Sequence, residues 1–585
     1  MWRTWAHRLL VALLSWTAVA ALACGGEKQE ARRTVAPGGT AQAAGYTPAP
    51  RDQQRFVVNM GATPDFLDPH KSQFEQDIAI ERLLFRGLFY TDEKGNPIPA
   101  VAAELPTQQN GGISADGKTL TIKLKDNQKW SDGSPLTAKD FEYSIKRAFH
   151  PKLASPYASF LFNIKGSAEY YNALGSEKSP KNPSQEELNR LRDNVGVKAL
   201  DDRTLQIQLQ EPQGTILVLL GLWVMYPVKQ SVVEAGGAGP ENTKWAAPGK
   251  LVGNGPFVLK EFREKDRIIL EANANYTLEP KPKLQTLDVR LIEDEESAFA
   301  SFQTGELDEV AVPPSKVSVV ESDPNLKKLN ITGPVPRTGG IEFNFSVKPL
   351  DNRNVRLAIA KAIDREAFVR VVLPGVGQPT QCWLAPGTPG YDPNDCTAIA
   401  YDPAEAKRLL AQAGYPNGQG FPELSLLVVN SPLGKNIGEF VQKQLKDNLN
   451  ITIKLELVDS KTRSSRYSNS QFELFYGGWQ EDYHDPENWI PELWGTGGGN
   501  NQYKYSNPQL DALIKQAKFE LNNEKRIALY KQMHKLLIDD ANGAWLDTRI
   551  RNALLKSKVK NVTPNGQDAG WLGQFNVERV EIAKE

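Results

Sequence analysis

Four short stretches of the chain alternate between apolar and polar residues. They cover residues 119–124, 204–209, 286–292 and 451–458. Successive side chains of a strand point to opposite faces, so this alternation predicts strands with one buried face and one polar face. A longer apolar run, residues 215–225, is too short to cross a bilayer and is interpreted as buried core.

Two other stretches carry start signals for helices. Asp402-Pro403 precedes residues 404–413, and Gly414 follows them, which predicts a helix with an N-cap, a first-turn proline and a closing glycine. Asn507-Pro508 opens a second helix in the same way. Its predicted apolar face contains Leu510, Leu513, Ile514 and Ala517. Strands and helices alternate without a strict βαβ rhythm or a short repeat, which predicts a mixed α/β or α+β architecture.

The first residues have the pattern of an export signal. A positive leader precedes the apolar residues 9–21, and small residues lie just ahead of Cys24. This pattern predicts a signal peptide over residues 1–23 and resembles the lipobox of bacterial lipoproteins, in which the cysteine is diacylated. The alternative is an ordinary secretory signal with an incidental cysteine.

Residues 24–51 are rich in small and polar residues, which predicts a flexible tether after the lipidated Cys24. The remaining chain exceeds 500 residues and is too long for one core, so we expect two or three domains. The 69 basic and 70 acidic side chains nearly balance, and nothing in their distribution indicates a nucleic-acid partner. We therefore expect a protein outside the cytoplasm, attached to the cell membrane by lipid.

Two further cysteines, Cys382 and Cys396, lie close together in a stretch rich in proline and glycine. Outside the cytoplasm such a pair most often forms a disulfide. A metal site would need further ligands, and the five histidines are scattered along the chain. We therefore expect a disulfide, with no metal and no cofactor.

Signatures of catalysis are absent from the sequence. It contains no GxSxG, HExxH, P-loop or complete GxGxxG motif. The glycine cluster at 495–499 is followed by asparagines and is interpreted as a mobile loop. We therefore expect a protein that is not an enzyme.

Seven blocks of sequence resemble, in order, the solute-binding proteins of peptide ABC importers, especially the oligopeptide-binding lipoproteins. The blocks are LDPHK (67–71), LFRGL (84–88), KWSDGSPLTAKDF (129–141), ASPYAS (154–159), GNGPF (253–257), NVR with AIDR (354–356 and 362–365), and GWQEDY (478–483).

The resemblance implies a periplasmic-binding-protein-like clam of three domains, with a hinge between two lobes that close over an extended peptide. It also implies delivery of the peptide to a permease and its ATPase, and we expect the protein to act as a monomer. The implied domains are domain I (52–85, 224–333 and 544–585), domain II (86–223) and domain III (334–543).

The same resemblance identifies Asp482 as the residue that binds the peptide amine, with Trp479 as an aromatic wall and Gln480 beside it. The alternative for Asp482 is a turn cap exposed to solvent. A receptor for many peptides must bind what they share, namely the amine and the backbone groups. Glu481 and Asp485 are expected to be surface charges.

Four further positions are implied by the resemblance. Gln73 and Glu75 correspond to a strand that pairs with the peptide backbone, and Tyr157 and Asn254 correspond to residues that line the cleft. A core tyrosine and a turn asparagine are the structural alternatives.

Two positions depart from close relatives, which have basic residues where this chain has Tyr476 and Tyr467, so binding of a peptide's C-terminal carboxylate is not implied. The same fold also carries nickel chelates, sugars, opines and cell-wall peptides, and a surface hydrolase is the alternative from another class.

Overall fold

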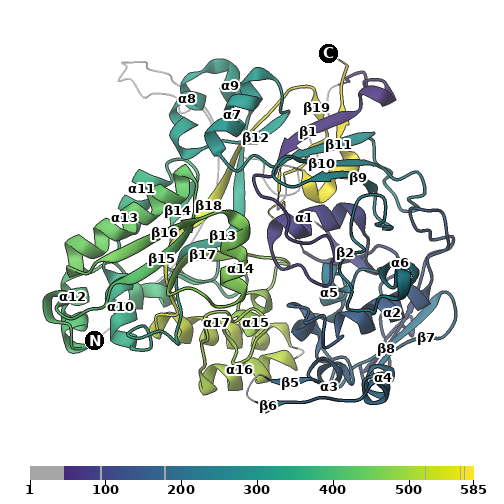
Figure 1. Ribbon diagram of the computed structural model, residues 1–585, viewed down its shortest axis with the longest axis horizontal. Coiled ribbons are helices and arrows are strands. Elements are labelled where there is room, and N and C mark those ends of the chain that lie inside the picture. The colour runs from purple at the N-terminus through teal and green to yellow at the C-terminus, as the bar shows by residue number, and fades with distance from the viewer. Residues whose placement is uncertain are drawn as a thin grey trace, which may run out of the picture. The chain divides into compact units, whose positions relative to one another are not determined.

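The computed structural model describes residues 45–92, 95–176, 179–520, 522–564, 566, 568, 570–571 and 573–584. The predicted signal peptide, Cys24 and most of the predicted tether lie outside these residues. The described chain mixes helices and strands throughout (Figure 1), which confirms the predicted fold class.

Seventeen α-helices occur in the described residues. They are α1 (Glu75–Leu84), α2 (Ala138–Ala148), α3 (Ser167–Tyr171), α4 (Gln185–Asp193), α5 (Ile216–Leu219), α6 (Gln230–Val233), α7 (Glu295–Thr304), α8 (Val317–Ser322), α9 (Pro324–Leu329), α10 (Arg353–Lys361), α11 (Arg365–Val372), α12 (Pro403–Gln412), α13 (Pro432–Leu449), α14 (Ser460–Ser468), α15 (Pro491–Trp494), α16 (Pro508–Lys518) and α17 (Asn523–Asp539). The short 3-10 helices include η6 (Pro393–Ile399) and η8 (Pro486–Asn488). No helix in this part of the chain is both long enough and apolar enough to span a membrane.

The strands form two large sheets and several small ones. The larger sheet has the order β12 (Glu309–Ala311), β18 (Gly543–Leu555), β13 (Asn330–Phe343), β17 (Leu474–Gln480), β15 (Leu424–Val429) and β16 (Ile453–Val458), with β14 (Gly377–Pro379) paired to β18. A four-stranded sheet has the order β1 (Arg55–Asn59), β11 (Thr286–Arg290), β10 (Arg267–Ala272) and β9 (Phe257–Arg263). A three-stranded sheet contains β4 (Thr119–Lys123), β8 (Thr204–Gln208) and β7 (Val197–Ala199). The pairs are β2 (Phe89–Thr91) with β3 (Pro97–Pro99), β5 (Gly175–Ser176) with β6 (Ser179–Pro180), and β19 (Val559–Lys560) with β20 (Glu581–Ile582).

The predicted elements are present. The four alternating stretches form β4, β8, β11 and β16, and the two capped stretches form α12 and α16. The side chain of Asp402 accepts a hydrogen bond from the backbone N–H of Glu405, and that of Asn507 accepts from Gln509 and Leu510. The caps therefore act as the sequence predicts.

The buried apolar side chains form two clusters. The first cluster contains residues between 49 and 291, together with Tyr483 and residues from 553 to 582, and the second contains residues between 298 and 554. The first cluster joins residues assigned from the sequence to domains I and II. The division into three domains therefore stays a prediction.

Two long antiparallel strands, β13 and β18, contribute to both clusters and lie side by side in Figure 1. On β13, Ile331 packs against the first cluster, whereas Ile341 belongs to the second. The pairing register shifts between Val335 and Thr338, as in a β-bulge, and Pro336 in this interval has no N–H to donate. The connection between the clusters thus contains a local irregularity in the ladder.

Residues 46–49 correct the predicted extent of the tether. Ala49 is buried and its N–H donates to the carbonyl oxygen of Ile582 (2.8 Å), while the N–H of Lys584 donates to Thr47 (2.8 Å). Backbone pairing with the C-terminal segment orders these residues, although their composition is that of a linker.

Candidate ligand-binding site

The GWQEDY motif begins at the end of β17, in the larger sheet. Gly478 has φ +145°, and a Cβ at this position would lie 1.9 Å from the carbonyl oxygen of Thr338 on β13. Only glycine fits here. This close approach of two strands sets the point from which Trp479 and the following loop leave the sheet.

The loop after β17 passes from one hydrophobic cluster to the other and back. Trp479 packs against both clusters, Tyr483 belongs to the first, and Trp489 belongs to the second. Asp482 lies within this crossing and is partly buried. The sequence motif is therefore located where the two clusters meet.

The carboxylate of Asp482 is held by two neutral donors. Its Oδ2 accepts from the hydroxyl of Tyr157 (3.1 Å) and from Nδ2 of Asn488 (2.9 Å). The Oδ1 of Asn488 accepts in return from the backbone N–H of Asp482 (2.8 Å) and from Nε1 of Trp479 (2.9 Å). One asparagine therefore orients both Asp482 and Trp479.

Aromatic rings form one side of this site. The rings of Tyr157 and Trp479 stack with centroids 6.5 Å apart, and Tyr157 also contacts Trp223 at 4.5 Å. Tyr157 is 1% exposed. The structure thus brings Asp482, Trp479 and Tyr157 together, and their contact with a ligand stays a prediction.

Burial raises the pKa of Asp482 to about 6, although the hydrogen bond from Asn488 and the charge of Arg82 oppose the rise. Among the described residues, no lysine or arginine forms an ion pair with this carboxylate. Within the described part of the chain, the site therefore contains a partly desolvated carboxylate whose direct hydrogen-bond donors are neutral, with the charge of Arg82 nearby.

This pKa predicts opposite effects of pH on ligand binding and on folding. An ammonium ligand needs ionised Asp482, so affinity should fall as pH drops through about 6, by up to about tenfold per unit. The raised pKa also means that Asp482 favours folding of the ligand-free protein below its unfolded pKa, and that this contribution is lost as pH rises through about 6. Titration calorimetry and denaturant unfolding between pH 5 and 7 measure the two effects, with Asp482→Asn as the control. An unchanged pH profile of binding in that variant would contradict this role.

Gln73 and Glu75 require a correction. They do not form a strand, because Gln73 lies in a loop and Glu75 is the first residue of α1. The amide of Gln73 donates to the hydroxyl of Ser468 at the end of α14. Residue Glu75 is exposed at the start of α1, yet desolvation raises the pKa of its carboxyl. Its charge adds a small contribution to the raised pKa values of Asp482 and Tyr157, which burial mainly causes. A role of Glu75 in ligand binding stays a prediction.

The side chains of two other predicted site residues, Asn254 and Gln480, hydrogen-bond the backbone of neighbouring segments. The side chain of Asn254 is buried and hydrogen-bonds both the N–H and the carbonyl oxygen of Arg86, at 2.9 Å each. The side chain of Gln480 donates to the carbonyl oxygen of Asp568 at 3.5 Å. In this structure both amides bind backbone, and their contact with a ligand stays a prediction.

Glu481 and Asp485 are not the surface charges expected from the sequence. Glu481 is 6% exposed and its Oε1 lies 2.9 Å from Nδ1 of His484. Asp485 caps η8 by accepting from the N–H of Glu487 and forms a bidentate ion pair with Arg526, at 2.7 and 2.6 Å. Asp485, rather than Asp482, is the turn cap.

Tyr476 and Tyr467, which stand where close relatives have basic residues, hydrogen-bond other side chains. The hydroxyl of Tyr476 donates to Asp547 (2.7 Å) and accepts from Arg549 (2.9 Å), and Tyr467 hydrogen-bonds Tyr503 (2.9 Å). One turn before Tyr467 on α14, Arg463 stacks on Phe475 and donates to the carbonyl oxygen of Tyr476. Arg463 thus places a positively charged side chain near Tyr467 and Tyr476.

A small cavity lies directly against Asp482. Its volume is 20 Å³, and Arg82, Trp223, Tyr226, Tyr483 and Phe575 are among its lining residues. That volume is about what one water molecule needs. A group the size of an ammonium therefore fits beside the carboxylate in this arrangement.

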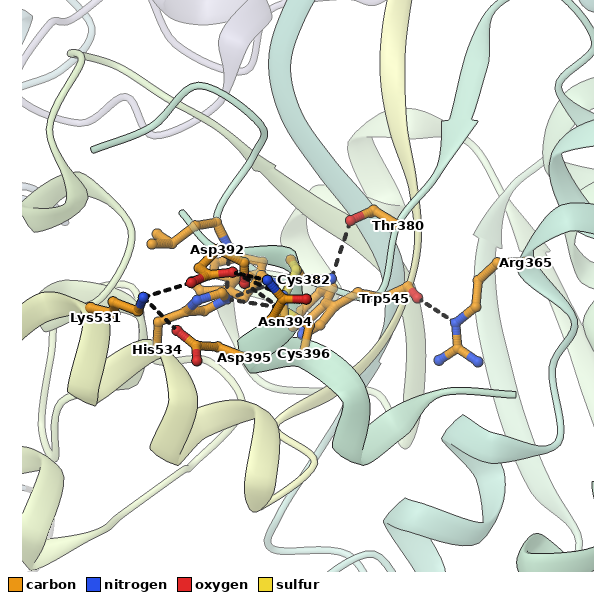
Figure 2. Close-up of a disulfide and its surroundings, with 12 residues drawn as sticks. Arg365, Thr380, Cys382, Asp392, Asn394, Asp395, Cys396, Lys531, His534 and Trp545 are labelled. Atoms are coloured by element: carbon orange, nitrogen blue, oxygen red, sulfur yellow. Dashed lines mark hydrogen bonds and ion pairs between the residues drawn. A yellow bond between two sulfur atoms is a disulfide. The ribbon is translucent and has the colours of Figure 1, made fainter. Parts of the chain in front are cut away.

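The structure joins Cys382 and Cys396 in the disulfide expected from the sequence (S–S 2.09 Å, Cα–Cα 5.3 Å) (Figure 2). The bond lies inside the protein. Cys396 lies in η6, both cysteines are buried in the second cluster, and His534 of α17 lies beside them. The scattered histidines of the sequence therefore do include one next to this pair.

Comparison with known proteins identifies the family. The family model described as bacterial extracellular solute-binding proteins, family 5, matches residues 96–501. The chain belongs to this family. The periplasmic murein peptide-binding protein MppA of Escherichia coli (strain K12) is 30% identical over 532 residues, which cover 88% of this chain and 92% of MppA. The oligopeptide-binding protein OppA of Bacillus subtilis (strain 168) is 28% identical over 520 residues, covering 86% and 89%.

A solved structure of the E. coli MppA matches this solute-binding protein with a TM-score of 0.79 at 28% identity, covering 91% of this chain and 99% of that one. An unliganded open form of MppA matches with a TM-score of 0.61 at 28% identity, covering 93% and 99%. The fold is thus the clam-like fold of the periplasmic peptide-binding proteins. The lower score indicates that the structure described here differs more from the open form.

Asn488 is the site residue that sequence reasoning missed. It lies six positions after Asp482 and has no distinctive sequence signal of its own. The Asp485-Pro486 pair predicts a turn, and in the structure η8 returns the chain so that Asn488 faces Asp482.

Proposed function

We propose that this solute-binding protein captures extended peptides outside the cytoplasm and delivers them to the permease of an ABC importer, acting as a monomer without catalysis. The observation that carries the proposal is the carboxylate of Asp482. It is partly desolvated, is oriented by Tyr157 and Asn488, and lies beside a cavity of 20 Å³. A peptide's N-terminal ammonium is the cation common to all unmodified peptides, and such a site suits it.

Further support comes from the position of Asp482 between the two hydrophobic clusters. Its partner Tyr157 belongs to the first cluster, and the Trp489 that follows its partner Asn488 belongs to the second. A ligand bound at Asp482 would therefore contact groups from both, as expected for a binder whose lobes close on the ligand. The relatives named above as peptide-binding proteins are consistent with this ligand class.

Native mass spectrometry of protein purified from cell extract tests the proposal. A receptor for many peptides should retain a series of peptide masses. One discrete non-peptide mass would instead indicate a receptor for another solute. Turnover of a model peptide by the purified protein would indicate a hydrolase, and either result would overturn the proposal.

Attachment to the membrane through Cys24 is part of the proposal, supported by the signal-like pattern of residues 1–23. Replacing Cys24 with serine removes the thiol that would be acylated. The protein should then move from the membrane fraction to the soluble or secreted fraction, while peptide affinity stays unchanged. Detergent partitioning followed by immunoblotting measures this. Unchanged partitioning of Cys24→Ser would contradict lipidation at this residue.

A further inference from the structure

Three side chains with sulfur or imidazole donors meet inside the second hydrophobic cluster. Cys382 follows β14, Cys396 lies in η6 and His534 lies on α17, and none is more than 1% exposed. Figure 2 shows the histidine beside the disulfide. The Sγ of Cys396 lies 4.0 Å from Nε2 of His534, and the two sulfurs and a ring nitrogen all lie within 4.8 Å of one another.

His534 is in the form that binds metal ions. Its Nε2 accepts hydrogen bonds from the backbone N–H groups of Trp383 (3.1 Å) and Leu384 (3.3 Å), so this nitrogen has a lone pair. The other nitrogen, Nδ1, is buried and has no hydrogen-bond partner among the described residues. Within the described part of the chain, the hydrogen bonds that orient the ring are therefore those at Nε2.

The neighbouring carboxylates are paired with another cation. The Nζ of Lys531 lies 2.6 Å from the carboxylate of Asp392 and 3.6 Å from that of Asp395 (Figure 2). Among the residues that the structure describes, the metal-binding donors that remain in this cluster are two sulfurs and one imidazole nitrogen. Thiolate and imidazole ligands select thiophilic cations such as Zn²⁺ and Cu⁺ rather than cations that prefer oxygen.

The geometry points to a metal site that opens when the disulfide is reduced, in which Cys382, Cys396 and His534 bind one thiophilic cation. The spacing requires little movement of the histidine. In tetrahedral zinc sites, a sulfur and a nitrogen ligand lie about 3.5 Å apart, given Zn–S of about 2.3 Å and Zn–N of about 2.0 Å. The observed Cys396 to His534 distance is 4.0 Å.

Each chemical step balances. An external dithiol gives two electrons and two protons to the S–S bond, which breaks into two thiols while the dithiol becomes a disulfide. Binding of the cation then releases the two thiol protons to solvent, because thiolates are the ligands. Metal affinity should therefore rise with pH in the reduced protein and be absent in the oxidised protein.

The test compares the oxidised and the phosphine-reduced full chain, each equilibrated with Zn²⁺ or, in a second arm, with Cu⁺ under anaerobic conditions. Bound metal is measured by elemental analysis after desalting, and near-ultraviolet circular dichroism confirms that the reduced protein stays folded. The reduced protein should retain one ion per chain and the oxidised protein none. Equal binding in the two redox states, or none in the reduced state, would overturn the inference.

Variants separate this site from adventitious thiol binding. His534→Gln keeps an oxygen acceptor for the two backbone N–H groups but removes the nitrogen ligand, so zinc affinity should fall at least about 100-fold. The matched control His484→Gln replaces a histidine outside the cluster and should bind zinc like the reduced wild type. If His534→Gln does not fold, Cys396→Ser serves as a second variant; it cannot form the disulfide and should not bind zinc with or without the phosphine. Undiminished zinc binding by either folded variant would refute the assignment.

Discussion

Replacing Asp482 with alanine is expected to weaken peptide binding by about two to three powers of ten. If Asp482 pairs with the peptide ammonium in a closed site, each charge depends on the other. Removal of one partner from a buried pair typically costs about 3–5 kcal/mol. Tyr157 and Asn488 would keep their positions through other contacts, so the melting temperature of the ligand-free protein should change little. Titration calorimetry with a defined peptide measures the loss.

A double cycle assigns this loss to one interaction. Acetylating the peptide amine should weaken binding to the wild type by a similar factor. The two losses should not add when combined, because both delete the same pair. Asp482→Asn keeps a side chain of the same shape and tests the charge alone. Additive losses, or an acetylated peptide that binds as well as its parent, would remove Asp482 from the site.

Replacing Asn488 with alanine should weaken peptide binding about 10- to 100-fold. The variant loses the hydrogen bond to the carboxylate of Asp482 and those from its N–H and from Trp479. A hydrogen bond to a charged group contributes about 1.5–3 kcal/mol, which corresponds to this range. Asn488 is a positioning residue in this interpretation, since it acts on the ligand through Asp482 and Trp479.

The pH dependence distinguishes positioning from a general loss of structure. The bond from Asn488 lowers the pKa of Asp482, so its removal should raise that pKa further above its usual value. The pH at which amine binding is half lost should therefore move upward in Asn488→Ala. A weaker affinity with an unchanged pH midpoint would indicate that Asn488 only supports the fold.

Local signals in the sequence were sufficient for several elements. The N-caps Asp402 and Asn507 predict α12 and α16, because a cap and a first-turn proline act within a few residues. The resemblance predicted Asp482 and Trp479 together, and the structure places them in one site. Cys382 and Cys396 are only 14 positions apart, so their disulfide could also be predicted from the sequence.

Features that depend on distant segments could not be predicted in this way. His534 reaches the disulfide from α17, and no spacing in the sequence relates it to the cysteines. Glu481 was expected on the surface because acidic residues are rarely buried, yet its N–H pairs with Pro336 and its side chain contacts His484. Gln73 and Glu75 were transferred as a strand, whereas Gln73 lies in a loop and α1 begins at Glu75.

The irregularity in β13 lies next to the loop that contains the candidate ligand-binding residue Asp482. The carbonyl oxygen of Pro336 accepts from the N–H of Glu481 at 3.0 Å, one residue before Asp482. Bending the paired strands at this bulge would, through this hydrogen bond, move the backbone of Glu481 and with it the neighbouring Asp482. Separation of the two clusters and withdrawal of the Asp482 carboxylate from the ligand amine would then be one movement, so opening would itself break the contact that holds the peptide.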